Sequence, residues 1–126
     1  RYTYGRITFD WDENGFNIRD RAALEAQIRR DLNVDAGSRQ VGRRSGSQGT
    51  LDVNVAIRRV NSNSVRADVR LGLNRDGRGG SAVTATESAT TASRDRNIDS
   101  QVVLRAFRAA RREFTTKVNQ YARDGR

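Results

Sequence analysis

The 126-residue sequence contains no cysteine and no histidine. The chain can therefore form no disulfide and no thiolate or imidazole metal site, and it lacks the side chains that most often act as general base or thiol nucleophile. Carboxylates are the main acid–base groups that remain. We expect a protein that is not an enzyme and that needs no cofactor.

Long apolar runs are also missing, so no transmembrane segment is expected. Hydrophobic residues make up 35% of the chain, which indicates a modest core within a single domain spanning residues 1–126. The sequence begins at Arg1 and contains no methionine. We therefore expect a processed or truncated chain, from which any signal or anchor segment is already gone.

Strict alternation of apolar and polar residues dominates the middle of the chain. The apolar positions are Leu51, Val53, Val55 and Ile57 in the first run and Val65, Ala67, Val69, Leu71 and Leu73 in the second. Alternation places all of these side chains on one face of two strands. The polar link at residues 61–64 suits a turn, so the sequence predicts an antiparallel hairpin whose apolar face needs a cover.

Two further strands are predicted. Residues 1–11 alternate at Ile7, Phe9 and Trp11, whereas the two N-terminal tyrosines are out of phase with them. A bulge at Gly5 would reconcile the two phases. Alternatively, Tyr2 and Tyr4 lie on the outer face. Residues 81–93 are rich in threonine and alanine and predict a third strand of the meander, at an edge of the sheet.

Two segments have helical periodicity. Leu24, Ile28 and Leu32 predict a helix over residues 19–33 that is capped by Asn17 or Asp20. The clearest helix follows Asp99, which is a good N-cap, and ends near Gly125. Its apolar stripe consists of Val103, Phe107, Ala110, Phe114, Val118 and Tyr121.

The order strand–helix–strand–strand–strand–helix predicts an α+β fold. We expect a two-layer sandwich in which a mostly antiparallel sheet carries both helices on one face. Residues 35–49, rich in glycine, serine and arginine, predict a mobile loop.

The net charge is +9, and Lys117 is the only lysine. Arginine suits carboxylates and phosphates, so one hypothesis is binding to an acidic partner or polyanion through two groups of arginines. These are Arg39, Arg43 and Arg44 in the loop and Arg105, Arg108, Arg111 and Arg112 on the last helix. A nucleic-acid-binding module is the alternative function, and it would place the protein in the cytoplasm. A genomic preference for arginine on a solvated surface would explain the same composition.

One short motif resembles a calcium loop. Residues 10–15, DWDENG, match the first six positions of an EF-hand loop, with Asp10, Asp12 and Asn14 as candidate ligands. The closing position, where a bidentate glutamate belongs, is Arg21. A polar turn between strand and helix is the alternative. Two more carboxylates, Asp52 and Asp68, fall on the polar face of the hairpin, where ion pairing with arginine is the alternative to acid–base chemistry.

The order of elements resembles that of small bacterial envelope lipoproteins and of the periplasmic domain of curli-type secretion channels. The runs LDVNVAI (51–57), VRADVRL (65–71) and AFRAA (106–110) are similar to the corresponding pieces of those proteins. The resemblance implies a non-catalytic structural domain in the periplasm or cell envelope, which assembles with copies of itself or within a larger complex. It transfers no site residues.

Overall fold

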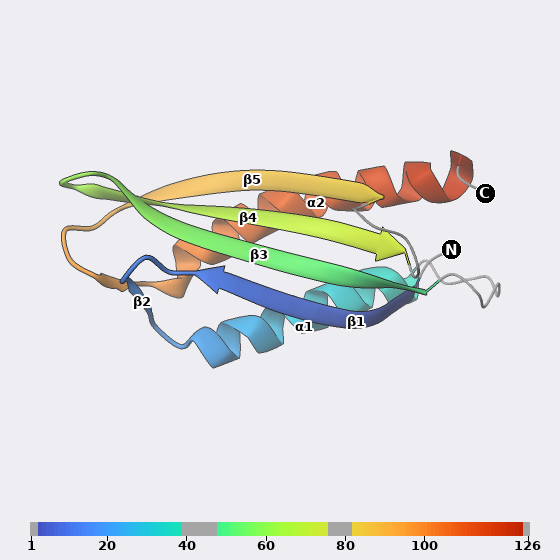
Figure 1. Ribbon diagram of the computed structural model, residues 1–126, viewed down its shortest axis with the longest axis horizontal. Helices are drawn as coiled ribbons and strands as arrows, with labels where there is room; N and C mark the ends of the chain where they lie inside the picture. The colour runs from blue at the N-terminus through green and yellow to red at the C-terminus, as the bar shows by residue number, and fades with distance from the viewer. Residues whose placement is uncertain (1–2, 39–47, 76–81, 125–126) are drawn as a thin grey trace.

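The structure is a computed structural model that describes residues 3–38, 48–75 and 82–124 (Figure 1). Its long strands are β1 (Thr3–Asp12), β3 (Gln48–Asn61), β4 (Ser64–Arg75) and β5 (Val83–Ala92). The helices are α1 (Arg21–Ser38) and α2 (Ser100–Asp124), and two short strands, β2 (Asn17–Ile18) and β6 (Asn97–Ile98), precede them. No helix within the described ranges is both long and apolar enough to cross a membrane.

The four long strands form one sheet in the order β1-β3-β4-β5. The pairs β3–β4 and β4–β5 are antiparallel, and the predicted hairpin is confirmed with Val53 opposite Leu71 and Val55 opposite Val69. Its turn consists of Ser62 and Asn63. The period-2 pattern sets this register, because a slip by one residue would expose the whole apolar face.

Strand β1 pairs with β3, and this pair is parallel. A parallel neighbour requires a crossover, which α1 supplies between the two strands. The register shifts between Tyr4 and Arg6, which confirms the bulge predicted at Gly5. The alternation over residues 1–11 predicts a strand but does not indicate which strand pairs with it.

Both helices lie against the same face of the sheet, as Figure 1 shows, and the α+β prediction is confirmed. Helix α2 contacts β4 and β5, while α1 contacts β1. The predicted apolar positions of both helices are buried together with the apolar odd-numbered side chains of the hairpin, except that Tyr121 is partly buried against this core. No polar or charged residue of the described ranges is fully buried.

Both ends of the loop predicted at residues 35–49 belong to other elements in the structure. Helix α1 continues to Ser38 and β3 begins at Gln48, so both ends of that prediction are wrong. The extra helical turn carries Asp35, which pairs with Arg111 of α2, a tertiary contact that no local pattern signals. Residues 39–47 lie outside the described ranges, and so do the candidate site residues Arg39, Arg43 and Arg44.

The helix starts follow the predicted capping chemistry in part. Asp99 Oδ1 accepts a hydrogen bond of 3.0 Å from the backbone N–H of Gln101, as an N-cap does. At α1 the backbone carbonyl of Asp20 accepts from the N–H of Leu24, and Asp20 has a φ of 58°. The other candidate cap, Asn17, belongs instead to β2, which pairs with β6.

Candidate functional site

The outer edge of β5 is partly covered by two basic side chains of α2. Lys117 Nζ donates to the carbonyl oxygen of Thr84 at 3.0 Å, and Arg105 Nη2 donates to that of Thr90 at 2.9 Å. In an antiparallel strand the N–H and C=O of one residue point to the same side. The even-numbered residues of β5 therefore direct their backbone groups away from β4.

Between these two capped carbonyls lies an open segment formed by Thr86 and Ser88. Their side chains are exposed, and the Ser88 hydroxyl bonds Asp68 on the outer face of the sheet. By the same alternation, their backbone N–H and C=O groups point out of the edge. No described residue bonds those outward groups. We call Thr86–Ser88 the open segment of β5.

The opposite edge of the sheet is better guarded. Strand β1 contains the bulge at Gly5 and the exposed carboxylates of Asp10 and Asp12. In addition, Arg29 of α1 donates to the carbonyl of Ile7 at 2.9 Å. Bulges, charges and covering side chains are the devices by which proteins prevent edge pairing. The β4–β5 ladder has no such irregularity, so β5 is the more receptive edge.

The one charged residue of β5 is Glu87, in the middle of the open segment. A hydrogen bond with the Glu113 carboxyl of α2 raises the pKa of Glu87, and desolvation and the charge of Glu113 add to the rise. The pKa of Glu113 is lowered, first by its hydrogen bond with Lys117 and then by the bond with Glu87. When the pair takes up one proton, these directions favour Glu87 over Glu113 as the carboxyl that binds it.

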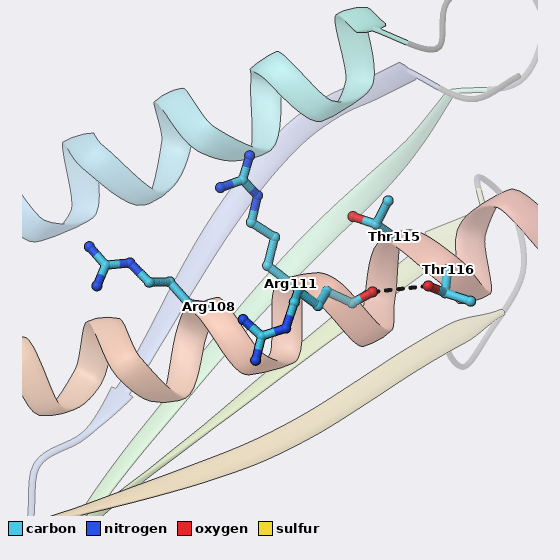
Figure 2. A pocket seen from close by; sticks show the side chains of 5 residues that line it. Arg108, Arg111, Thr115 and Thr116 are labelled. Carbon is cyan, nitrogen blue, oxygen red and sulfur yellow. Dashed lines mark hydrogen bonds between the residues drawn. The ribbon is translucent and has the colours of Figure 1, made fainter.

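The four candidate arginines of α2 do not act as one set. Arg105 is bound to β5. Figure 2 shows Arg111 extending toward α1, where its Nε and Nη2 each lie 2.8 Å from the Asp35 carboxylate. The hydrogen bond with Asp35 raises the pKa of Arg111 against the opposing effect of burial. Arg108 and Arg112 are exposed and lie beside a hollow of about 470 Å³ that Thr115 and Thr116 also line.

The three candidate calcium ligands lie in two different elements, β1 and the turn that follows it. Asp10 and Asp12 are exposed on β1, whereas Asn14, with a φ of 51°, donates from Nδ2 to the carbonyl of Ile57 at 2.7 Å. Arg21, at the closing position, forms an ion pair of 2.5 Å with Glu13. The described ranges contain no group of three or more acidic, histidine or cysteine side chains that could hold a metal. In this structure Asn14 joins the end of β1 to β3.

The two carboxylates of the hairpin belong to separate networks. Asp52 is opposite Gly72, whereas Asp68 is opposite Ala56. Asp52 accepts hydrogen bonds from Thr8 Oγ1 at 2.7 Å and from Asn74 Nδ2 at 2.5 Å. Ion pairing with arginine, the alternative to acid–base chemistry, is what the structure shows for Asp68.

Asp68 pairs with Arg66 at 2.9 Å and with Arg58 at 3.8 Å. Burial raises the pKa of Asp68, but the bonds from Ser88 and Arg66 and the two arginine charges together lower it. The carboxylate is therefore held in its ionised form. Such a group stabilises a surface network and is poorly suited to take up a proton near neutral pH.

Comparison with known proteins found no matching family model, no matching curated protein and no matching solved structure. The features of this chain that bear on function are therefore the surfaces described above. The sequence predicts β5 as an edge strand but does not predict its open segment, because the two side chains that cap the flanking carbonyls come from α2. The spacing of Arg105 and Lys117 on the helix does not reveal that they reach a strand.

Proposed function

We propose that this protein is a non-enzymatic assembly domain that joins copies of itself through the edge of β5. One observation carries the proposal: between two capped carbonyls, the outward backbone groups of Thr86 and Ser88 have no hydrogen-bond partner among the described residues. An unpaired strand edge is a template for another strand, whose backbone hydrogen bonds provide the affinity. The setting in the bacterial cell envelope is supported by the resemblance in the order of elements alone.

The chemistry of β5 fits strand addition. Its outer-face residues are Thr84, Thr86, Ser88 and Thr90, which are small and polar and allow a neighbouring strand to approach. Threonine also favours the extended conformation that pairing requires. The exposed Arg108 and Arg112 lie on the adjoining helix, where they can contact acidic groups of a neighbouring subunit.

The proposal is tested by replacing one backbone N–H of the open segment. In Thr86→Pro the missing N–H is one that points away from β4, so the ladder within the monomer is retained. We expect the wild-type chain to form a discrete oligomer that survives moderate salt, and Thr86→Pro to be a folded monomer. Native mass by light scattering and helix content by circular dichroism give the two measurements.

Thr86→Ala is the matched control, because it shortens the same side chain and keeps the N–H. It should assemble like the wild type. If Thr86→Pro assembles as well as Thr86→Ala does, the edge of β5 is not the joining surface and the proposal is wrong.

A second candidate function is nucleic-acid binding. It is favoured by the exposed Arg108 and Arg112 beside the hollow on α2. This alternative predicts a monomer that binds RNA or DNA at low salt and releases it steeply as salt rises. The double variant Arg108→Gln/Arg112→Gln should then lose that binding while retaining the wild-type melting temperature.

A further inference from the structure

We infer that two copies pair β5 against β5 about a two-fold axis at Glu87, forming a closed dimer whose strength is controlled by protonation of that residue. The two four-stranded sheets then join into one continuous sheet. This inference rests on the proposed assembly function and adds the register, the closure and the regulation.

The register follows from the positions of the capped carbonyls. Thr84 and Thr90 lie three residues to either side of Glu87, and the carbonyl oxygen of each accepts a hydrogen bond from an α2 side chain. An antiparallel pair centred on Glu87 sets Thr86 of each copy opposite Ser88 of the other. The outward backbone N–H and C=O groups of these two residues can then bond to each other. Centring on Thr86 would set Ser88 opposite the capped Thr84, and centring on Ser88 would set Thr86 opposite the capped Thr90.

The same symmetry closes the assembly. A two-fold interface uses the same surface on both copies, so both β5 edges are consumed in one dimer. The edges that remain are those of β1, which carry the Gly5 bulge, Asp10, Asp12 and the Arg29 cap. Further growth of the sheet is therefore disfavoured.

Glu87 becomes the central pair of this interface. Residues opposite each other between hydrogen-bonded pairs approach to a Cα separation of about 4.5 Å, and like charges placed there are destabilising. The charged groups that face Glu87 are Glu113, Arg112 and Lys117 of α2. The residue opposite it on β4 is the uncharged Val69.

Lys117 cannot neutralise the new carboxylate pair without losing its present partners. It lies 3.0 Å from Glu113 and donates to Thr84 as well. Within one copy the pKa of Glu87 is already raised, and a second Glu87 raises it further. The dimer therefore binds protons more strongly than the monomers do, and it should strengthen as the pH falls.

The pH dependence is measured by sedimentation of the wild type and of Glu87→Gln. At about pH 4.5, the ordinary pKa of glutamate, a carboxyl with a raised pKa is more than half protonated. We expect the wild-type Kd to be about fivefold lower there than at neutral pH, the factor that corresponds to one unfavourable like-charge pair. Glu87→Gln should dimerise at neutral pH as tightly as the wild type does in acid. A wild-type Kd that is unchanged or weakened in acid would overturn the regulation.

The register is tested by cross-linking, which the absence of native cysteine makes unambiguous. Thr86→Cys and Ser88→Cys chains are mixed and oxidised. The opposed Cα atoms, about 5.5 Å apart, lie within the range of a disulfide. A cross-linked dimer should form in the mixture and not in either variant alone.

The possible outcomes separate this inference from the proposed function. If Thr86→Pro is monomeric but the mixture gives no mixed disulfide, β5 is the joining edge and the two-fold register is wrong. If Thr86→Pro assembles normally, the proposed function itself is wrong.

Discussion

Arg111 offers a direct test of whether the arginines of α2 serve structure or binding. The sequence places it among the polyanion-binding candidates, whereas the structure pairs it with two carboxylates of α1. Its side chain is 30% exposed and that of Asp35 is 16% exposed. The Asp35 carboxylate accepts two bonds of 2.8 Å, and Asp31 Oδ2 lies 3.7 Å from Nη1.

The expected energy lies between two known limits. Exposed ion pairs contribute about 0.2–1 kcal/mol, whereas removal of one partner from a fully buried pair costs about 3–5 kcal/mol. For this half-buried, bidentate pair we expect Arg111→Met to lower the free energy of unfolding by about 1–2 kcal/mol. For a domain of this size the melting temperature should fall by about 3–8 °C. Methionine keeps most of the apolar stem, so the loss reports mainly on the ion pair.

Arg108→Met is the matched control on the same helix, because Arg108 is exposed beside the hollow. A surface substitution of this kind should change the free energy of unfolding by less than about 0.5 kcal/mol. Denaturant titration of the two variants, and of Asp35→Asn with and without Arg111→Met, yields the coupling energy of the pair. If Arg111→Met costs no more than Arg108→Met, or if the coupling is near zero, the pairing with α1 does not stabilise the fold.

Two further predictions concern stability. Arg59 lies 5.5 Å from the ring of the buried Phe16 and donates to four backbone carbonyls, including that of Ser93 at 3.0 Å. Arg59→Ala should therefore lower the free energy of unfolding by about 1–2 kcal/mol in urea titration, whereas Arg59→Lys should recover only part of that loss. The second concerns Asp68, whose pKa is lowered in the folded chain. Its contribution to stability is present above the unfolded pKa of 3.8 and is lost as the pH falls through the lower folded pKa. In thermal melts, the melting temperature of Asp68→Asn should therefore lie below that of the wild type at neutral pH and converge with it in acid. A difference that stays constant with pH would contradict this assignment.

Most of the fold could be predicted from the local periodicity of apolar residues. The alternation at 51–57 and 65–73, with a short polar link between the runs, leaves one register that buries the alternating apolar positions of both runs. The apolar stripe of α2 likewise determines which side of the helix meets the sheet. Both patterns depend only on residues a few positions apart, so they could be predicted from the sequence.

Contacts between distant elements could not be predicted in this way. The last turn of α1 contains Val34, which is 64% exposed, and its Asp35 is paired with a residue 76 positions away. The pairing of β2 with β6 joins two Asn-Ile dipeptides that are too short to show any period. The position of β5 at an edge of the sheet was predictable, but the caps on the Thr84 and Thr90 carbonyls depend on how α2 is placed across the sheet.

The arginine content has a structural explanation that does not need an anion. Arg29, Arg59, Arg96 and Arg105 all donate to backbone carbonyl oxygens. A carbonyl accepts a hydrogen bond without neutralising the charge of the donor. Each of these arginines therefore still counts toward the net charge of +9, although its guanidinium is used within the fold. An excess of positive charge therefore does not by itself locate a binding site in this protein. On β5 the same kind of contact reaches Thr84 and Thr90 but, within the described ranges, not Thr86 or Ser88. The proposed assembly surface is therefore drawn from backbone groups that lack a described partner, and not from the charge.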